Sequence, residues 1–283
     1  MIDDNAYINH LDSPYIVPAL ERGLRVLGEF NRSNQIVAPP ELARRLGLSR
    51  STVFRLLVTL ESLGFVERSK SGNEFRLGLA VLRLGFEYLA SLPLNELGRP
   101  LLRRLSEEIG YPCNIVVRDG RFIVYVTRVS PQSQASPFVS SVNVGTRLPA
   151  HATVLGRMLL ADLNLLRLED LYPEFDLESF SEHTPKTVIS LYSMVCNDFE
   201  KGYAIGEGFY EPSISSIAAP IFDQTGHIVA AMGVTINAGR FKDAQLDADR
   251  VEQIVDSVRR TAAELSRLLN YSSHLAVVES ERA

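Results

Sequence analysis

Between residues 39 and 64, hydrophobic positions recur with helical spacing in two short segments joined by a sharp turn. The first segment has an apolar face that includes Leu42 and Leu46. Pro40 suits a first helical position, and Gly47 can end that helix in a left-handed conformation. In the second segment the apolar residues lie at i, i+3, i+4 and i+7: Val53, Leu56, Leu57 and Leu60. The pattern predicts a helix pair with the spacing of a DNA-binding helix-turn-helix.

The second of these helices is polar on the side opposite its apolar stripe. Ser49 can cap it at the amide of Thr52, and Gly64 can end it. An arginine can read guanine in the major groove, and hydroxyl groups can bind phosphate. The side chains expected to contact DNA are Ser49, Arg50, Ser51, Thr52, Phe54, Arg55 and Thr59. The alternative is an ordinary buried helical hairpin that carries arginine on its solvent side.

The segment from Phe65 to Gly78 favours DNA binding. It predicts two short strands around a Ser-Lys-Ser-Gly-Asn turn. A basic hairpin directly after a recognition helix is the layout of a winged helix, and it lets Lys70 touch the sugar-phosphate backbone. A helix over residues 19–30 completes a three-helix core, with its apolar face formed by Leu20, Leu24, Leu27 and Phe30.

Length and charge divide the chain further. Its 283 residues exceed a winged helix and predict two domains. Residues 18–77 hold ten Arg and Lys against six Asp and Glu, a balance of +4, whereas the whole chain carries −5. This confines nucleic-acid binding to the basic module. The expected organisation is a disordered arm (1–17), a winged helix-turn-helix domain (18–78), a linker helix (79–94), a second domain (95–275), to which the family resemblance described below assigns effector binding, and a tail (276–283).

The linker segment 79–94 is hydrophobic around most of its helical circumference. Such a helix must be buried on more than one side. Packing against the same helix of a second subunit satisfies this, and a two-fold dimer also suits a palindromic DNA site. The alternative is burial of the helix within its own chain.

The remaining residues alternate between helices and strands. A helix ends at Gly110, and strands form a hairpin that turns at Asp119-Gly120. Helices begin near Ala152 and span 190–201, and a second hairpin turns at residues 224–226. A long amphipathic helix over 243–269 closes the pattern. These elements predict an α+β domain, with an antiparallel sheet that carries helices on its faces.

Composition limits location and chemistry. No apolar stretch approaches the roughly 20 residues of a membrane span, and residues 1–17 lack a signal peptide's features. Cys113 and Cys196 are too few for a disulfide framework, so a cytoplasmic protein is expected. The five histidines lack metal-ligand spacing, and no cofactor is expected. Motifs for serine hydrolases, nucleotide-binding loops and zinc proteases are absent, so no enzyme is expected. Cys113 and His151 could be imagined as a catalytic nucleophile and base, but no local sequence motif supports that pairing.

Several motifs in one order resemble the isocitrate lyase regulator (IclR) family of bacterial transcription factors. In the first domain they are ALERGLRVL, ELARRLGLSRSTVFRLLVTLESLGFV and FRLG. In the second they are GTRLPAHATVLGRMLLA and GYAIGEGFYEPSISSIAAPIFDQTGHIVAAMGVTI. The resemblance implies a winged helix joined by a helix to a GAF-like effector domain, in a dimer or a dimer of dimers. VNVGTRLPAHATVLGRMLLA and NAGRF are similar to the branch that regulates protocatechuate and hydroxybenzoate catabolism.

The resemblance also implies an effector site, at Val154, Leu155, Ile214, Ser216, Gly233 and Thr235. Physical reasoning adds Thr153 and Gly156, because a helix start offers unpaired amides and small side chains to a carboxylate. Ser215 or Ser216 can face the cavity with Thr235, and Met232 can add an apolar wall. Each hydroxyl could equally be an ordinary surface or backbone-bonded group. His151 and Arg147 could bind an anion or serve in capping.

The expected effector is a small organic acid, such as an aromatic carboxylate or its ring-cleavage product. An aspartate that some relatives offer their ligand falls at Gly206, so that side-chain contact is lost here. The chain is therefore interpreted as a DNA-binding regulator controlled by a small acid. The alternative is a ligand-independent regulator that uses its second domain only for oligomerisation.

Overall fold

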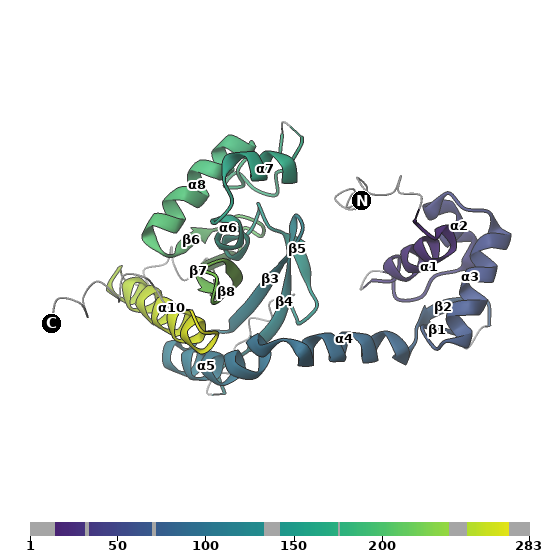
Figure 1. Ribbon diagram of the computed structural model, residues 1–283, viewed down its shortest axis with the longest axis horizontal. Coiled ribbons are helices and arrows are strands. Elements are labelled where there is room, and N and C mark those ends of the chain that lie inside the picture. Colours follow the sequence, from purple (N-terminus) through teal and green to yellow (C-terminus); the bar gives the residue numbers. More distant parts are fainter. Residues whose placement is uncertain are drawn as a thin grey trace. The chain divides into compact units, whose positions relative to one another are not determined.

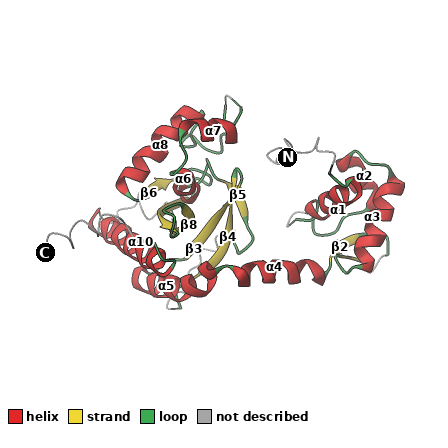
Figure 2. Cartoon of the chain, in the orientation of Figure 1, coloured by secondary structure: helices red, strands yellow, loops and turns green. Residues whose placement is uncertain are grey.

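The computed structural model describes residues 15–31, 34–69, 72–132, 142–174, 176–237 and 248–271. Lys70, the tail 276–283 and most of the predicted arm lie outside the described residues. The chain divides into two compact units, an N-terminal one that ends at Ser91 and an effector unit that begins at Leu92. Figures 1 and 2 show the elements of each unit.

The N-terminal unit consists of helices followed by a small antiparallel hairpin and a further helix. In chain order its elements are α1 (Pro18–Gly28), α2 (Pro39–Leu46), α3 (Arg50–Ser62), β1 (Val66–Arg68), β2 (Phe75–Leu77) and α4 (Leu79–Ser91). Proline opens α1 and α2, where the missing amide hydrogen costs nothing. Gly47 ends α2 with φ 64°, and the Ser49 side chain accepts from the Thr52 amide to cap α3. The predicted helix-turn-helix and wing strands are confirmed.

The core of this unit corrects the predicted apolar face of α1. Leu20 and Leu24 are 62% and 59% exposed, whereas Gly23 and Val26 are buried against the rest of the unit. The helix carries apolar or small residues on two adjacent sides, so its periodicity alone did not decide which side packs. The ten buried core residues are Val26, Phe30, Val37, Leu42, Ala43, Val53, Leu57, Leu60, Val66 and Phe75.

A contact that the sequence did not predict ties the wing to the helices. Val37 and Phe75 exchange two backbone hydrogen bonds, of 2.9 and 3.0 Å, as an antiparallel bridge. Both side chains are buried. The segment before α2 therefore acts as a short third strand beside β2, and it fixes the hairpin against the core.

The effector unit is a six-stranded antiparallel sheet between two layers of helices. Its strands are β3 (Cys113–Asp119), β4 (Phe122–Val129), β5 (Arg147–Pro149), β6 (Ala204–Glu207), β7 (Ile214–Phe222) and β8 (Ile228–Asn237). Its helices are α5 (Pro93–Ile109), α6 (Val154–Leu160), α7 (Leu165–Leu171), α8 (Val188–Lys201) and α10 (Ala248–Leu268). The strand order is β5-β4-β3-β8-β7-β6, which brings β3 beside β8 in the centre.

Helices cover both faces of this sheet. Helices α5 and α10 pack on one face, and α6 packs on the other, with α8 and α7 behind it. Figure 1 shows α5 and α10 side by side beneath the strands. The predicted α+β arrangement and both hairpins are confirmed, although the first hairpin turns at Gly120-Arg121, one residue later than predicted.

Turn and cap residues explain where these helices stop. Gly110 and Gly202 end α5 and α8 with φ 79° and 72°, a conformation that glycine adopts without strain. Thr187 and Ser190 form a capping box at the start of α8. In the part of the chain that the structure describes, no helix combines the length and apolarity needed to traverse a bilayer.

Candidate DNA-binding face and effector cavity

Helix α3 presents the side chains predicted to contact DNA on its solvent side. Arg50, Ser51, Phe54, Arg55 and Thr59 are exposed, and the Phe54 side chain is exposed although it is aromatic. The opposite side of the same helix packs into the core through Val53, Leu57 and Leu60. The helix is therefore held by its apolar stripe while its polar side remains accessible.

Ser49 and Thr52 lie close to the solvent side of α3, and their hydroxyls also form the hydrogen bonds that cap this helix. Ser49 Oγ accepts the Thr52 amide at 3.1 Å and lies 2.8 Å from the Thr52 hydroxyl. Thr52 is half-buried. Thr59 Oγ1 donates to the Arg55 carbonyl at 3.0 Å. These three hydroxyls thus form hydrogen bonds within α3 and its N-cap.

Ion pairing separates the arginines of this unit into two groups. Arg44 and Arg45 both bind Glu41, at 2.6 and 2.8 Å, and their hydrogen bonds lower the pKa of that carboxyl to about 2. Arg50 and Arg55 bind no carboxylate among the described residues. The donors of the two arginines on α3 are thus available to an external partner.

The wing strands carry arginines that are partly neutralised. Arg68 pairs with Glu61 at 3.0 Å and lies over the Phe75 ring, 4.8 Å from its centroid. Arg76 pairs with Glu67 at 2.6 Å across the strands. Lys70, the predicted backbone contact, lies outside the described residues.

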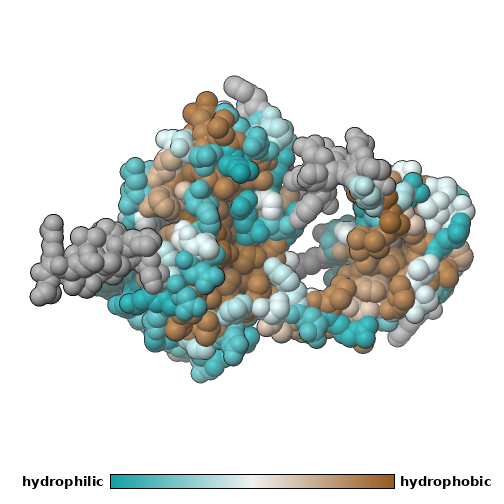
Figure 3. Space-filling model, viewed as in Figure 1, coloured by the Kyte–Doolittle hydropathy of each residue, from teal (hydrophilic) through white to brown (hydrophobic). Residues whose placement is uncertain are grey.

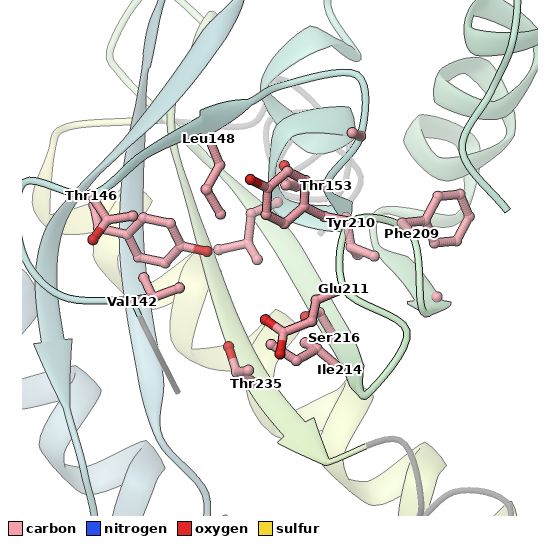
Figure 4. Close-up of a pocket in the computed structure, with 15 residues that line it drawn as sticks. Val142, Thr146, Leu148, Thr153, Phe209, Tyr210, Glu211, Ile214, Ser216 and Thr235 are labelled. Atoms are coloured by element: carbon pink, nitrogen blue, oxygen red, sulfur yellow. The ribbon is translucent and has the colours of Figure 1, made fainter. Parts of the chain in front are cut away.

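The effector unit contains a cavity of ≈ 140 Å³ between α6 and the sheet. Six of the eight predicted effector residues line it: Thr153, Val154, Leu155, Ile214, Ser216 and Thr235. Strands β7 and β8 pair Ser216 directly with Thr235, so both hydroxyls reach the same space (Figure 4). Ser215, the other predicted candidate, alternates to the opposite face of β7, and Met232 is buried outside the lining.

The other two predicted residues, Gly156 and Gly233, support the wall without lining it. A Cβ at Gly156 would lie 2.1 Å from the Ala150 carbonyl oxygen. A Cβ at Gly233 would lie 2.8 Å from the Ile217 carbonyl oxygen and 3.1 Å from the Leu155 side chain. Both glycines therefore serve close packing, which lets α6 approach the strands and place Leu155 at the cavity.

The start of α6 offers less to a carboxylate than its sequence indicated. Thr153 Oγ1 already accepts the Gly156 amide at 3.0 Å, and the helix has only seven residues. A short helix contributes a small dipole at its first turn. The Val154 and Leu155 amides have no acceptor within the described residues, so they remain open to a polar ligand group.

Ala152, at the predicted helix start, and Gly206, the position of the lost aspartate, also line the cavity. The remaining lining residues were not predicted from the sequence: Tyr125, Val142, Thr146, Leu148, Phe209, Tyr210 and Glu211. Alternation along β4 could have placed Tyr125 on the α6 side, but the loop residues become neighbours only through the tertiary fold. Burial raises the pKa of Tyr125 to about 12, so its phenol is a neutral hydrogen-bond donor.

Gly206 has a structural consequence beyond the lost aspartate. A Cβ at this position would lie 2.4 Å from the Phe209 ring, so the ring occupies the space that a side chain would need. Phe209 in turn lies on Arg157, with the guanidinium 4.4 Å from the ring centroid. Figure 4 shows Phe209 turned away from Thr235 and Thr146.

A buried ion pair underlies this side of the cavity. Arg157 and Asp198 meet at 2.8 Å with side chains 2% and 8% exposed, and Arg157 Nη2 also donates to the Ile205 carbonyl at 3.1 Å. Burial lowers the pKa of Arg157 and raises that of Asp198, while each charge opposes the shift of the other. Their pairing keeps α6 and α8 in a fixed register.

The side chains of Cys113, His151 and Arg147 are engaged within the fold and do not form a catalytic or anion-binding group. Cys113 is fully buried, and burial raises the pKa of its thiol, which keeps it protonated. His151 Nε2 lies 2.9 Å from the Glu178 carbonyl oxygen, and Arg147 pairs with Asp119 at 3.0 Å. No group of three or more potential metal ligands occurs among the described residues.

Helix α4 leaves its apolar side chains in solvent. Leu82, Phe86 and Tyr88 are 51%, 59% and 57% exposed, and Ala80 is the buried residue of this helix. The intrachain burial considered for this segment is therefore not observed. With Leu20 and Leu24 of α1, these residues give the N-terminal unit hydrophobic surface, part of which is visible in Figure 3.

Comparison with known proteins accounts for both units. Residues 19–70 match the IclR helix-turn-helix domain, and residues 86–267 match the bacterial transcriptional regulator IclR C-terminal domain. The Pca regulon regulatory protein of Pseudomonas putida is 30% identical over 234 residues, covering 83% of this chain and 79% of the relative.

Solved structures give the same result. A putative transcriptional regulator from Rhodococcus sp. RHA1 is 33% identical with a TM-score of 0.74, over 90% of this chain and 99% of the other. An IclR homologue from Microbacterium hydrocarbonoxydans, solved in complex with 4-hydroxybenzoate, is 25% identical with a TM-score of 0.74, over 90% and 100% of the two chains. The relatives are transcriptional regulators and not enzymes. This chain belongs to the IclR family of bacterial transcriptional regulators.

Proposed function

We propose that this regulator responds to a small organic acid that binds in the cavity of the effector unit. The observation that carries this is the convergence of six predicted residues on one cavity of ≈ 140 Å³. A cavity of roughly 150 Å³ can hold a benzene-sized molecule. The volume therefore suits a single ring or a short aliphatic acid.

Apolar walls and a few hydroxyls determine what fits. Val154, Leu155 and Ile214 can contact the body of the effector, and Ser216 and Thr235 can bind its polar groups. The 4-hydroxybenzoate in the Microbacterium homologue and the name of the Pseudomonas relative support an aromatic acid as the first candidate.

For DNA recognition, we propose that α3 lies in the major groove. Arg50 and Arg55 would contact base edges because their donors are unpaired among the described residues. Lys70 would contact the sugar-phosphate backbone. The expected partner is a double-stranded, palindromic operator, and a cytoplasmic location is part of the same proposal.

We further propose that the protein acts as a dimer through α4. The exposed side chains of Leu82 and Phe86 would be covered by the same helix of a second copy. A two-fold dimer would read a palindromic operator, and a dimer of dimers would read two such sites. The same helix joins the two units of each chain, so it could transmit ligand binding to the DNA-binding heads.

A thermal-shift panel tests the effector class. The full-length protein is mixed with benzoate, 4-hydroxybenzoate, 3,4-dihydroxybenzoate, adipate or glyoxylate, and with the primary amide of each acid. We expect at least one acid to raise the unfolding temperature, because a ligand that binds only the folded state stabilises it. If no acid does so while the protein binds its operator, the effector unit serves only oligomerisation. Turnover of any panel member would instead indicate an enzyme.

A further inference from the structure

Among the described residues, the lining of the cavity provides no cation for an acidic effector. None of its 15 lining residues is arginine, lysine or histidine, and Glu211 contributes a carboxylate. Ser213 Oγ donates to Glu211 Oε1 at 3.0 Å. An effector carboxylate that loses its hydration next to the Glu211 carboxylate needs a compensating positive charge. The cation must come from a residue just outside the lining.

Arg128 lies at that position on β4. It pairs in register with Asn114 of β3, which itself pairs with Gly233 of β8, two residues before Thr235. Its Nη1 lies 3.5 Å from Asn114 Oδ1, and Asn114 contacts the lining residue Thr235, so the guanidinium lies close to the cavity. Arg128 is half-buried, and burial lowers its own pKa.

No carboxylate neutralises Arg128 within the described residues. Other arginines of the effector unit differ: Arg157 pairs with Asp198 at 2.8 Å, and Arg121 pairs with Glu174 at 2.6 Å. A half-buried cation without an anion is costly to maintain. A negatively charged ligand would remove that cost.

Asn114 connects this arginine to the cavity. Its side chain is fully buried, and its Nδ2 donates to Thr235 Oγ1 at 3.1 Å. Its Oδ1 lies 3.5 Å from Arg128 Nη1, a long contact that leaves the guanidinium's other donors free. Because Thr235 Oγ1 accepts from Asn114, its own hydrogen remains to donate to a ligand oxygen.

We propose that Arg128 binds the effector's carboxylate at the Thr235 end of the cavity, with Asn114 orienting both residues. This assigns a ligand orientation in which the acid group lies at β3, β4 and β8 and not at the start of α6. It rests on the proposed function, since it requires an acidic effector. Glu211 then faces the remainder of the ligand, which favours a hydroxyl or another hydrogen-bond donor there.

The test compares Arg128→Gln with Arg118→Gln in the full-length protein. Arg118 lies on the neighbouring strand β3, is exposed and forms no ion pair within the described residues, so its replacement removes the same charge. The probes are the panel acid that stabilises the wild type most and its primary amide, titrated by calorimetry. We expect Arg128→Gln to weaken acid binding roughly ten- to hundredfold, as for loss of a charged hydrogen-bond partner. Amide binding should be unchanged, and Arg118→Gln should match the wild type.

Two outcomes overturn the assignment without touching the proposed function. Wild-type acid affinity in Arg128→Gln, combined with weakened binding in Thr235→Val, would place the carboxylate elsewhere in the same cavity. Equal losses for acid and amide would show that Arg128 only supports the fold, and Arg128→Lys, which keeps the charge, would then not restore acid binding. If no panel acid binds the wild type, the acidic effector and the role of Arg128 fail together.

Discussion

The two units of this chain place their functional groups in opposite ways. In the N-terminal unit, the side chains proposed for DNA contact lie on one exposed helix, whose other side is fixed in the core. In the effector unit, the cavity is assembled from α6, five strands and intervening loops, with residues as distant in sequence as Tyr125 and Thr235. An exposed helical face can be recognised from periodicity, whereas a cavity needs the tertiary structure.

Charges follow the same division. Arg50 and Arg55 of α3 are exposed and unpaired among the described residues. Arg157, beneath the cavity, is buried and paired with Asp198. Removing Asp198 should therefore lower the stability of the effector unit. Removing Arg50 or Arg55 should leave the fold of the N-terminal unit intact.

The largest effect is expected for Asp198→Asn, which leaves the Arg157 guanidinium buried without its anion. Breaking one side of a buried pair costs about 3–5 kcal/mol. Chemical denaturation followed by circular dichroism should show this loss in the effector unit. Asp256→Asn is the control, because its pair with Arg259 at 4.0 Å is exposed and such pairs contribute at most about 1 kcal/mol. Equal losses in the two variants would contradict a structural role for the buried pair.

The next largest effect concerns assembly. Replacing Leu82 and Phe86 together by glutamate would place two charges in the proposed α4 seam, so light scattering should show a lower oligomeric state. Leu166→Glu makes the same chemical change at a leucine that is 71% exposed in the effector unit, and it should leave the mass unchanged. An unchanged mass in the double variant would exclude α4 as the dimer contact.

On α3, Arg55→Ala or Arg50→Ala should weaken specific operator binding without unfolding the protein. A bidentate base contact contributes about 1–3 kcal/mol. Fluorescence anisotropy with operator and scrambled DNA measures the change, and Arg44→Ala is a suitable control because Arg44 is bound by Glu41. Unchanged operator affinity in both α3 variants would refute the recognition-helix assignment. Lys70→Ala should instead weaken all sequences alike and flatten the salt dependence.

These predictions also show where sequence information was sufficient. The α3 stripe, the capping serine and the turn glycines have local causes, so the helix-turn-helix and both large hairpins were predictable. The exposed face of α1 was not, because Leu20 and Leu24 compete with Gly23 and Val26 for the core.

Contacts between distant segments account for the other differences. Val37 joins β2 through a backbone bridge that no local pattern specifies. Arg128 and Asn114 meet only because β3 and β4 pair in one register. Gly156 and Gly233 were expected at the ligand, yet their neighbours show that they permit close packing.

A smaller effect concerns the pH dependence of the stability of the effector unit. Burial lowers the pKa of His151 below its ordinary value of 6.5, so the unfolded chain takes up its proton first as pH falls. The resulting stability is fully present above pH 6.5 and declines below it. His151→Gln should flatten the pH dependence of unfolding between pH 7.5 and 5. An unaltered pH dependence in His151→Gln would contradict this origin.

The central claim is that a ligand in the effector cavity controls DNA binding. To do so, the ligand must bind one arrangement of the DNA-binding heads more tightly than another. A coupling of about 1–3 kcal/mol would change operator affinity several-fold to roughly a hundredfold. The direct measurement titrates the tightest-binding panel acid while operator binding is followed in wild type, Thr235→Val and Ser216→Leu. We predict that both variants bind operator normally without ligand and lose most of the ligand response, and a full response in both would place the effector site elsewhere.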